Sequence, residues 1–556
     1  MIGVASKPGQ AALVEEFFEL FKTPWEFYVP GRTYDVVVVT TDEVTDVEAA
    51  LVIVYGAEPK PFDIRHGICG YARKRNACLA WEATQVPLYA ELLTFDRRGG
   101  VDACVRSSDG EIAGVRVEGA EGALIRLGYD VFDEMQRLFV AGQPVGHAHV
   151  PTLDLHIAML RQWIVQAGLP LVEVSPTPAG HPFFACLTHD IDFVGIRRHR
   201  FDHTLGGFLY RSTIGAIRNV ARGRLSLARL WKTWRAVVSL PFVYLGWAKD
   251  FWNPFEWYLQ IERNLPATYY LIPFKRRAGD RVVGTHAARR GAPYDVTDAE
   301  LGEWIPRLLE AGAEVGVHGI DAWHSASKGH AELARVAAAT GASAIGVRMH
   351  WLLCDADTPS VLERAGYSYD STSGYNETIG YRTGTTQVFR PLGVRTLLQL
   401  PMHIQDGALF YPQRLDLPEP EAETRCGALV DRAKTLGGVL TVLWHDRSHG
   451  PERFWGDFYV NLVDTLKASG AAFATAQQVV TWFRLRRQVR FETFEHAGRT
   501  QIRVRSEAAA VEPPLRVVLH NVNARKGEAE IAWDGGTPIT VDTSRNRPRL
   551  AWARAL

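Results

Sequence analysis

Several short apolar runs in the middle of the chain end on carboxylates, histidines or an arginine. A carboxylate and a neutral imidazole together suit zinc or a similar borderline divalent ion. The chemistry that these residue types favour is therefore that of a divalent metal site. The runs and the groups that follow them are Phe183–Leu187 before His189, Asp190 and Asp192; Glu314–Val317 before His318; Ile345–Val347 before Arg348 and His350; Leu397–Pro401 before His403; and Val439–Trp444 before His445.

Asp190 and Asp192 are the first of these groups along the chain. Residues two apart on a strand share a face, so both carboxylates would enter the same space at the strand end. Two adjacent carboxylates repel each other, and a cation beside them relieves that repulsion. The alternative is an Asp pair at a strand-to-helix turn, where Asp is common. His318, at the end of a later run, favours the metal site over that alternative.

These groups would be carried by strands that have polar residues at one end. When parallel strands all end in polar side chains, those side chains line the active rim of a β/α barrel. The same arrangement, usually followed by a helical segment, recurs over residues 180–486. We therefore predict an α/β fold, with a distorted (β/α) barrel over this range.

The remainder of the chain divides into two further regions. Residues 1–176 contain the continuous apolar runs Val36–Val39 and Leu51–Val54, typical of strands buried on both faces, and predict a mixed α/β domain. The Pro- and Gly-containing segment Val174–Gly180 is predicted as the boundary between this region and the barrel. Residues 488–556 alternate apolar and polar positions and predict a small all-β, sandwich-like domain.

Taken in order, the motifs of residues 180–486 resemble the polysaccharide deacetylase family, the NodB-homology domain. The resemblance includes the order of an aspartate pair, a histidine, an arginine motif and a late Leu-x-His motif. The segments that carry it are Leu187-Thr188-His189-Asp190-Ile191-Asp192, Val317-His318, Gly346-Val347-Arg348-Met349-His350-Trp351, Ala365-Gly366-Tyr367-Ser368-Tyr369-Asp370-Ser371 and Val442-Leu443-Trp444-His445.

The resemblance implies a metal held by Asp192 and His318. The family's second histidine lies four residues after the first, and this position here is Ala322. We expect His324 as the third ligand. The alternatives that the sequence leaves open are Asp321, His350 and His403.

The resemblance also assigns the proton transfers. Asp190 would be the general base and His445 the general acid that protonates the departing amine. Asp370 would raise the pKa of His445, because a nearby carboxylate stabilises the imidazolium. Arg348 would hold one of the acids through a bidentate contact.

A basic insertion interrupts the predicted barrel at residues 197–250. Between Arg197 and Arg235 there are ten Lys or Arg and one acid, Asp202, in an amphipathic helical pattern. One hypothesis is a helix that lies on an anionic membrane or binds an acidic glycan. The other is a solvated helical hairpin packed against the barrel.

The composition limits the remaining function classes. The 62 basic and 62 acidic residues cancel, so the whole chain has no charge that would favour a nucleic-acid partner. The six cysteines contain no C-x-x-C pair, so neither a disulfide framework nor a cysteine zinc site is indicated. The first residues lack the pattern of a secretion signal, and we expect a cytoplasmic protein, with membrane association through the insertion as an alternative.

The function predicted from the resemblance is removal of N-acetyl groups, or alternatively O-acetyl groups, from a polysaccharide or its precursor, with one divalent metal ion, zinc by preference. Aromatic residues near the predicted rim, such as Trp351 and Trp444, would suit a carbohydrate cleft, or they belong to the core. The alternative function is a catalytically inactive carbohydrate-binding protein on the same barrel.

Overall fold

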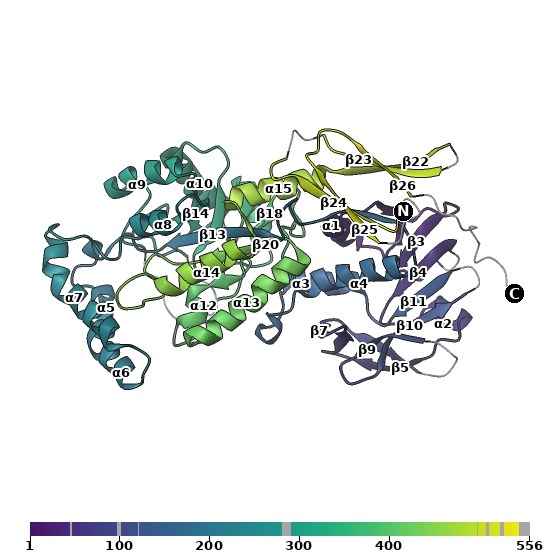
Figure 1. Ribbon diagram of the computed structural model, residues 1–556, viewed down its shortest axis with the longest axis horizontal. Coiled ribbons are helices and arrows are strands. Elements are labelled where there is room, and N and C mark those ends of the chain that lie inside the picture. The colour runs from purple at the N-terminus through teal and green to yellow at the C-terminus, as the bar shows by residue number, and fades with distance from the viewer. Residues whose placement is uncertain are drawn as a thin grey trace.

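The computed structural model describes residues 1–44, 47–96, 102–119, 122–280, 291–497, 499–507, 511–522 and 527–543. The molecule is elongated (Figure 1). The helices of the basic insertion stand at one end, a parallel sheet with its helices forms the middle, and the sheets of the first and last parts of the chain form the other end.

The middle of the molecule is a mixed α/β structure around a curled parallel sheet. Its main path runs β18-β17-β16-β15-β14-β13-β20-β19, and every neighbouring pair is parallel. In the described part of the chain β18 and β19 do not pair, so the sheet is a half-barrel open on one side. The strands are β13 (Phe184–Ile191), β14 (Ala267–Leu271), β15 (Glu314–Gly319), β16 (Gly346–Met349), β17 (Tyr369–Asp370), β18 (Leu398–Gln399), β19 (Ile404–Gln405), β20 (Val439–Leu443) and the short β21 (Ala472–Phe473), which pairs with β13.

Helices between these strands cover the half-barrel. α10 shows why they begin and end where they do: the Ser325 side chain accepts a hydrogen bond from the Lys328 amide at its start, and Gly341 ends it in the left-handed conformation, with φ 70°. All eight residues of β13 are buried, as expected for a central strand covered on both faces. The helices are α8 (Phe255–Ile261), α9 (Ala299–Glu310), α10 (Ala326–Thr340), α11 (Thr358–Ala365), α12 (Asp406–Phe410), α13 (Glu419–Leu436), α14 (Gly456–Ala468) and α15 (Ala476–Gln488).

The first part of the chain forms a separate large sheet. Five strands are parallel in the order β2-β1-β3-β4-β11, and antiparallel strands extend the sheet beyond β11. The apolar runs predicted as strands lie in β3 and β4. The elements are β1 (Ile2–Ala5), α1 (Ala11–Phe21), β2 (Trp25–Phe27), β3 (Tyr34–Val39), β4 (Ala49–Tyr55), α2 (Pro61–Arg65), β5 (Gly70–Lys74), β6 (Cys78–Trp81), β7 (Thr84–Pro87), β8 (Leu92–Phe95), β9 (Asp102–Ser107), β10 (Ile112–Glu118), β11 (Ala123–Leu127), α3 (Val131–Val140) and α4 (Thr152–Gln166).

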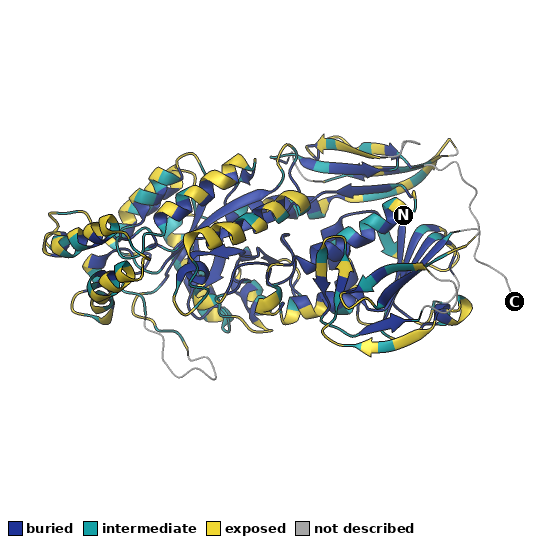
Figure 2. Cartoon of the chain, turned by 60° about the horizontal axis from the view of Figure 1, so that its bottom comes forward, coloured by how far each residue is buried: buried dark blue, intermediate teal, exposed yellow. Residues whose placement is uncertain are grey.

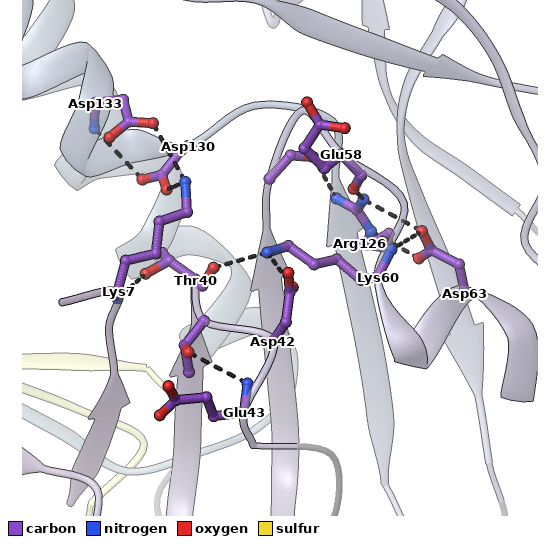
Figure 3. Close-up of polar contacts among 12 residues, drawn as sticks. Lys7, Thr40, Asp42, Glu43, Glu58, Lys60, Asp63, Arg126, Asp130 and Asp133 are labelled. Carbon is purple, nitrogen blue, oxygen red and sulfur yellow. Dashed lines mark hydrogen bonds and ion pairs between the residues drawn. The ribbon is translucent and has the colours of Figure 1, made fainter.

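Charged side chains at the carboxyl edge of this parallel sheet pair with one another (Figure 3). Lys7 contacts Asp130 at 2.7 Å, and Lys60 contacts Asp42 at 2.6 Å. The fully buried Arg126 donates to Asp63 at 2.7 Å. A buried charge is tolerated when it is paired, so these groups fasten the loops that follow the strands.

The last part of the chain contributes two three-stranded sheets. One contains β22 (Arg490–His496), β23 (Arg499–Arg505) and β26 (Ile539–Asp542). In the other, β24 (Leu515–His520) pairs with β25 (Glu528–Trp533) and also with β12 (Leu171–Val174). A strand from the first part of the chain therefore completes the second sheet. The division at 176 and 488 into independent domains stays a prediction.

The insertion is helical. It consists of α5 (His203–Tyr210), a π-helical turn (Arg211–Gly215), α6 (Ala216–Ala221) and α7 (Leu227–Tyr244). Buried Phe208, Leu240, Val243 and Trp252 form its own small core. Within the described residues, no helix is both long enough and apolar enough to cross a membrane.

Candidate active site

A cavity of about 830 Å³ lies at the carboxyl ends of the half-barrel strands. The ends of β13, β15 and β16 and the segment after β20 supply its floor. The root of the insertion, including His199 and His203, supplies part of its wall. The predicted residues that line it are Asp190, Asp192, His318, His350 and His445.

Asp192, His318 and His350 form a compact group in this cavity. The Nε2 atoms of His318 and of His350 each lie 3.4 Å from Oδ1 of Asp192. One donor atom from each of the three residues lies within 4.8 Å of the others. One carboxylate and two imidazoles are the donor set of many open zinc sites.

Two further observations fit a cation among these three residues. Asp192 Oδ1 is buried and has no hydrogen-bond partner, although such atoms are rarely left unsatisfied. Nδ1 of His318 lies 3.1 Å from the carbonyl oxygen of Arg348, and donation to it leaves the lone pair on Nε2, the atom that faces Asp192. The residues present therefore fit a divalent ion.

The charge state of Asp192 agrees with this arrangement. Burial by itself would raise the pKa of its carboxyl group, but in the absence of a metal the hydrogen bond to His318 and the positive charges of protonated His350, His318 and His445 outweigh burial and hold the pKa well below its usual value. Asp192 thus stays ionised, as a metal ligand must.

His350, and not the expected His324, completes the group. Ala322, four residues after His318, is fully buried, and the space beside it is filled by α10, where a Cβ on Gly329 would lie 3.1 Å from the Ala322 Cβ. No room remains there for an imidazole. His350 comes from the loop after the neighbouring strand β16, where Trp351 and Leu352 both have positive φ, 65° and 53°. Such strained backbone in non-glycine residues often occurs at functional sites.

His324 lies in a different cluster. Its Nε2 atom is 3.0 Å from Asp280 and 3.7 Å from Asp321, the other nearby alternative. The ammonium group of Lys328 contacts both carboxylates, at 2.5 and 3.4 Å. A lysine therefore already compensates one of the two negative charges of this cluster.

The tight packing around Ala322 predicts the effect of a larger side chain at this position. Ala322→His is expected to lower the free energy of unfolding by about 1–3 kcal/mol, because it overfills a packed site, without increasing zinc affinity. Chemical denaturation and zinc titration measure the two effects. The control Ala334→His, on the exposed side of α10, should change stability by less than about 0.5 kcal/mol. Tighter zinc binding in Ala322→His would contradict the packing argument.

Asp190 is held in the floor of the cavity by Arg348. Nη1 of the buried Arg348 donates to Asp190 Oδ1 at 3.1 Å and to the Thr188 hydroxyl at 2.7 Å. Its other nitrogens donate to Ser371. The contact with Asp190 is through one nitrogen and is not the bidentate pair that the sequence suggested. It still fixes the carboxylate at the end of β13.

His445 has a buried carboxylate partner, and that partner is Asp406. His445 Nδ1 lies 2.5 Å from Asp406 Oδ1, and the His445 amide donates to Asp406 Oδ2 at 2.8 Å. The expected partner, Asp370, instead accepts hydrogen bonds from the amide and hydroxyl of Thr372. The Asp406 side chain has 0% exposure, whereas that of His445 has 20% and reaches the cavity.

This pairing determines the proton affinity of His445. Burial by itself would lower its pKa, but the charge of Asp406 and the hydrogen bond to it, with the charges of Asp192 and Asp190, raise the pKa to about 10. His445 therefore carries a proton at neutral pH.

The loop that carries His445 is fixed from both sides. The Tyr258 hydroxyl donates to the His445 carbonyl at 2.8 Å, and the Phe193 amide donates to Asp446 at 3.0 Å. The ends of β13 and β20 are thereby tied together.

Asp406 is the functional residue that the sequence analysis missed. It follows the two-residue strand β19, which lies beside β20 in parallel register, with Gln405 opposite Leu443. The same strand-end criterion that selected His403 could have found it three residues later. His403 is buried and contacts the backbone of Thr441 and Thr385, away from the metal group. Burial lowers its pKa to about 4, which keeps it neutral.

Comparisons with known proteins show only distant structural likenesses. No protein-family model matches the sequence, and no curated protein matches it significantly. A Mycobacterium smegmatis structure described as a polysaccharide deacetylase is 16% identical, with 56% of this chain and 95% of that chain covered and a TM-score of 0.33. A Pseudomonas aeruginosa PAO1 structure, also described as a polysaccharide deacetylase, is 12% identical. The match covers 56% of this chain and 94% of that chain, with a TM-score of 0.33. A Puue allantoinase structure is 12% identical, with 55% and 92% covered and a TM-score of 0.31. Similarity at this level says nothing about the reaction of this chain.

Proposed function

We propose that this protein is a metal-dependent hydrolase that removes acetyl groups from the amino groups of a polysaccharide or its precursor. One observation carries the proposal: the Asp192–His318–His350 group, the fixed carboxylate Asp190 and the protonated His445 line the same cavity. Together they offer a metal site, a base and an acid, the three parts that metal-dependent hydrolysis of an amide uses.

Each of the chain's own groups has a distinct role in this reaction. Asp190, held by Arg348, accepts the proton of the attacking water. His445 gives its proton to the nitrogen of the departing amine, and Asp406 stabilises the imidazolium before that transfer. A divalent ion held by Asp192, His318 and His350, with zinc favoured by the donor set, would polarise the acyl carbonyl and acidify a bound water.

The cavity wall supports a carbohydrate as the substrate. Trp351 is 53% exposed and lines the cavity together with Phe193 and Tyr411. Aromatic rings offer flat apolar faces on which a sugar ring can stack, and neighbouring polar groups can bind its hydroxyls. Trp444, another aromatic residue near the predicted rim, is fully buried and belongs to the core.

Incubation of the zinc-loaded protein with N-acetylglucosamine oligosaccharides tests the proposal. We expect one free amine for each acetate released, because His445 is placed to protonate a leaving nitrogen. Asp190→Asn should lower kcat by about 10²–10⁴-fold, the usual effect of removing a general base. The matched control is Asp431→Asn, on the exposed surface of α13.

Two outcomes would reject the proposal in this form. Acetate released without new amine would point to an O-ester. Oligosaccharide binding that a chelator leaves unchanged, with no acetate released, would point to a carbohydrate-binding protein without catalysis.

A further inference from the structure

The basic insertion exposes an unusual amount of apolar surface. It holds ten of the eighteen large apolar residues that are exposed in the described part of the chain. Many residues of its helices are coloured as exposed in Figure 2. Exposed apolar clusters of this kind usually mark a site where a protein contacts a partner or a membrane. The ten residues are Phe201, Tyr210, Ile214, Ile217, Leu227, Trp231, Val238, Phe242, Leu245 and Trp247.

Helix α7 and the turn after it have two apolar faces. One face is buried in the core of the insertion through Ala236, Leu240 and Val243. The opposite face, here called the outward stripe, follows the 3.6-residue helical period and is exposed. The packing of α7 in the insertion's core uses the other face, so the outward stripe is left for another contact. It consists of Leu227, Trp231, Val238, Phe242 and Leu245.

Exposed cations flank this apolar surface. Lys232 and Arg235 lie along one edge of the outward stripe, and Arg218 and Arg222 follow the exposed Tyr210, Ile214 and Ile217 of the preceding helices. None of these four cations forms an ion pair with an acidic residue that the structure describes. The ion pairs of Arg224 with Asp416 and of Arg229 with Glu419 lie where the insertion meets the half-barrel.

We propose that the insertion docks on the surface of an anionic lipid bilayer, with the outward stripe among the acyl chains and the flanking cations at the headgroups. This combination of an apolar face and flanking Lys and Arg is what interfacial helices require. An acidic glycan would satisfy the cations and could stack on the aromatic rings, but it would leave the aliphatic Leu227, Val238 and Leu245 in water. A second copy of the chain would bring its own cations against these.

Docking is independent of the proposed reaction, but it affects the cavity. His199 and Asp202, at the root of the insertion, line the cavity wall, so the insertion and the cavity lie at the same end of the half-barrel. A docked molecule therefore holds the cavity close to the bilayer. If the proposed function is correct, this position favours a lipid-linked sugar as the substrate.

Vesicle flotation with the full chain tests the docking. We expect binding to vesicles of phosphatidylcholine with phosphatidylglycerol, little binding to phosphatidylcholine alone, and weaker binding as salt rises, because screening shortens the reach of the cations. The triple variant Trp231→Ser, Val238→Ser and Phe242→Ser should bind anionic vesicles at least about tenfold more weakly than the wild type. The triple variant Arg218→Glu, Arg222→Glu and Lys232→Glu should lose at least as much.

Matched controls alter similar residues elsewhere. Ile64→Ser with Tyr71→Ser changes two exposed apolar residues of the first sheet region, and Arg263→Glu with Arg395→Glu changes two exposed cations of the half-barrel. Both controls should bind vesicles like the wild type, and unchanged melting temperatures show that every variant is folded.

Three results would overturn the proposal. The first is no flotation with anionic vesicles. The second is binding to a soluble acidic polysaccharide that matches the vesicle affinity and is unchanged by the stripe variant. The third is a concentration-dependent dimer that the stripe variant abolishes, without any lipid binding.

Discussion

His350→Ala is expected to abolish stoichiometric zinc binding, whereas His324→Ala leaves it intact. The first variant removes one of three donor groups around Asp192 Oδ1, and two protein ligands do not hold zinc firmly. Since loss of an outer-sphere partner alone costs about 10–100-fold in affinity, loss of a ligand should cost at least about 100-fold. Elemental analysis after dialysis and competition with a chromophoric chelator measure this change.

The controls separate loss of the ligand from loss of the fold. Asp192→Ala and His318→Ala should lose zinc like His350→Ala. Zinc should raise the melting temperature of the wild type and of His324→Ala, because binding to the native state stabilises it, but should not raise that of His350→Ala. Zinc lost in His324→Ala and retained in His350→Ala would place the site in the Asp280–Asp321–His324 cluster instead.

The location of the candidate site could be predicted, because it depends on short local patterns in the sequence. Apolar runs that end in polar residues identify buried strands, and the two-residue period places Asp190 and Asp192 on one side of β13. The order of the motifs placed His318 and His445 at the same rim. All four residues line one cavity in the structure.

The choice of the third ligand depends on contacts between elements. In the pairing of β15 with β16, His318 lies opposite Arg348. His350 follows Arg348 by two residues, directly after the end of β16. His324 is closer to His318 in sequence, but the chain between them continues into the core at Ala322. The space available at Ala322 and the turn at Trp351 decide between them, and neither can be derived from spacing.

The partner of His445 depends on the order of the strands. β19 follows β18 in the chain but lies beside β20, at the other end of the sheet path, so Asp406 meets His445. Asp370 ends β17, which in the described part of the chain pairs with β16 and β18 and not with β20. Sheet order is set by long-range packing, and no local pattern in this sequence reports it.

Asp406→Asn is expected to move the alkaline limb of the pH–rate profile to lower pH and to reduce kcat at pH 8 or above. His445 acts as an acid, so activity is present below its pKa and is lost as pH rises through that pKa. In the wild type the Asp406 carboxylate stabilises the imidazolium, and the pKa is raised to about 10. An amide in its place has no charge, so the pKa and the alkaline limb should fall by about 1–3 pH units.

Rate measurements on the zinc-loaded wild type and variant, over the same pH range, test this shift. Both proteins carry the same ion, so the comparison isolates the Asp406 charge. Asp370→Asn is the matched control and should leave the alkaline limb unchanged, since Asp370 bonds to Thr372. His445→Gln should lower kcat by about 10²–10⁴-fold and remove the limb itself. A limb that moves in Asp370→Asn and stays fixed in Asp406→Asn would mean that Asp370 controls the proton of His445 during turnover.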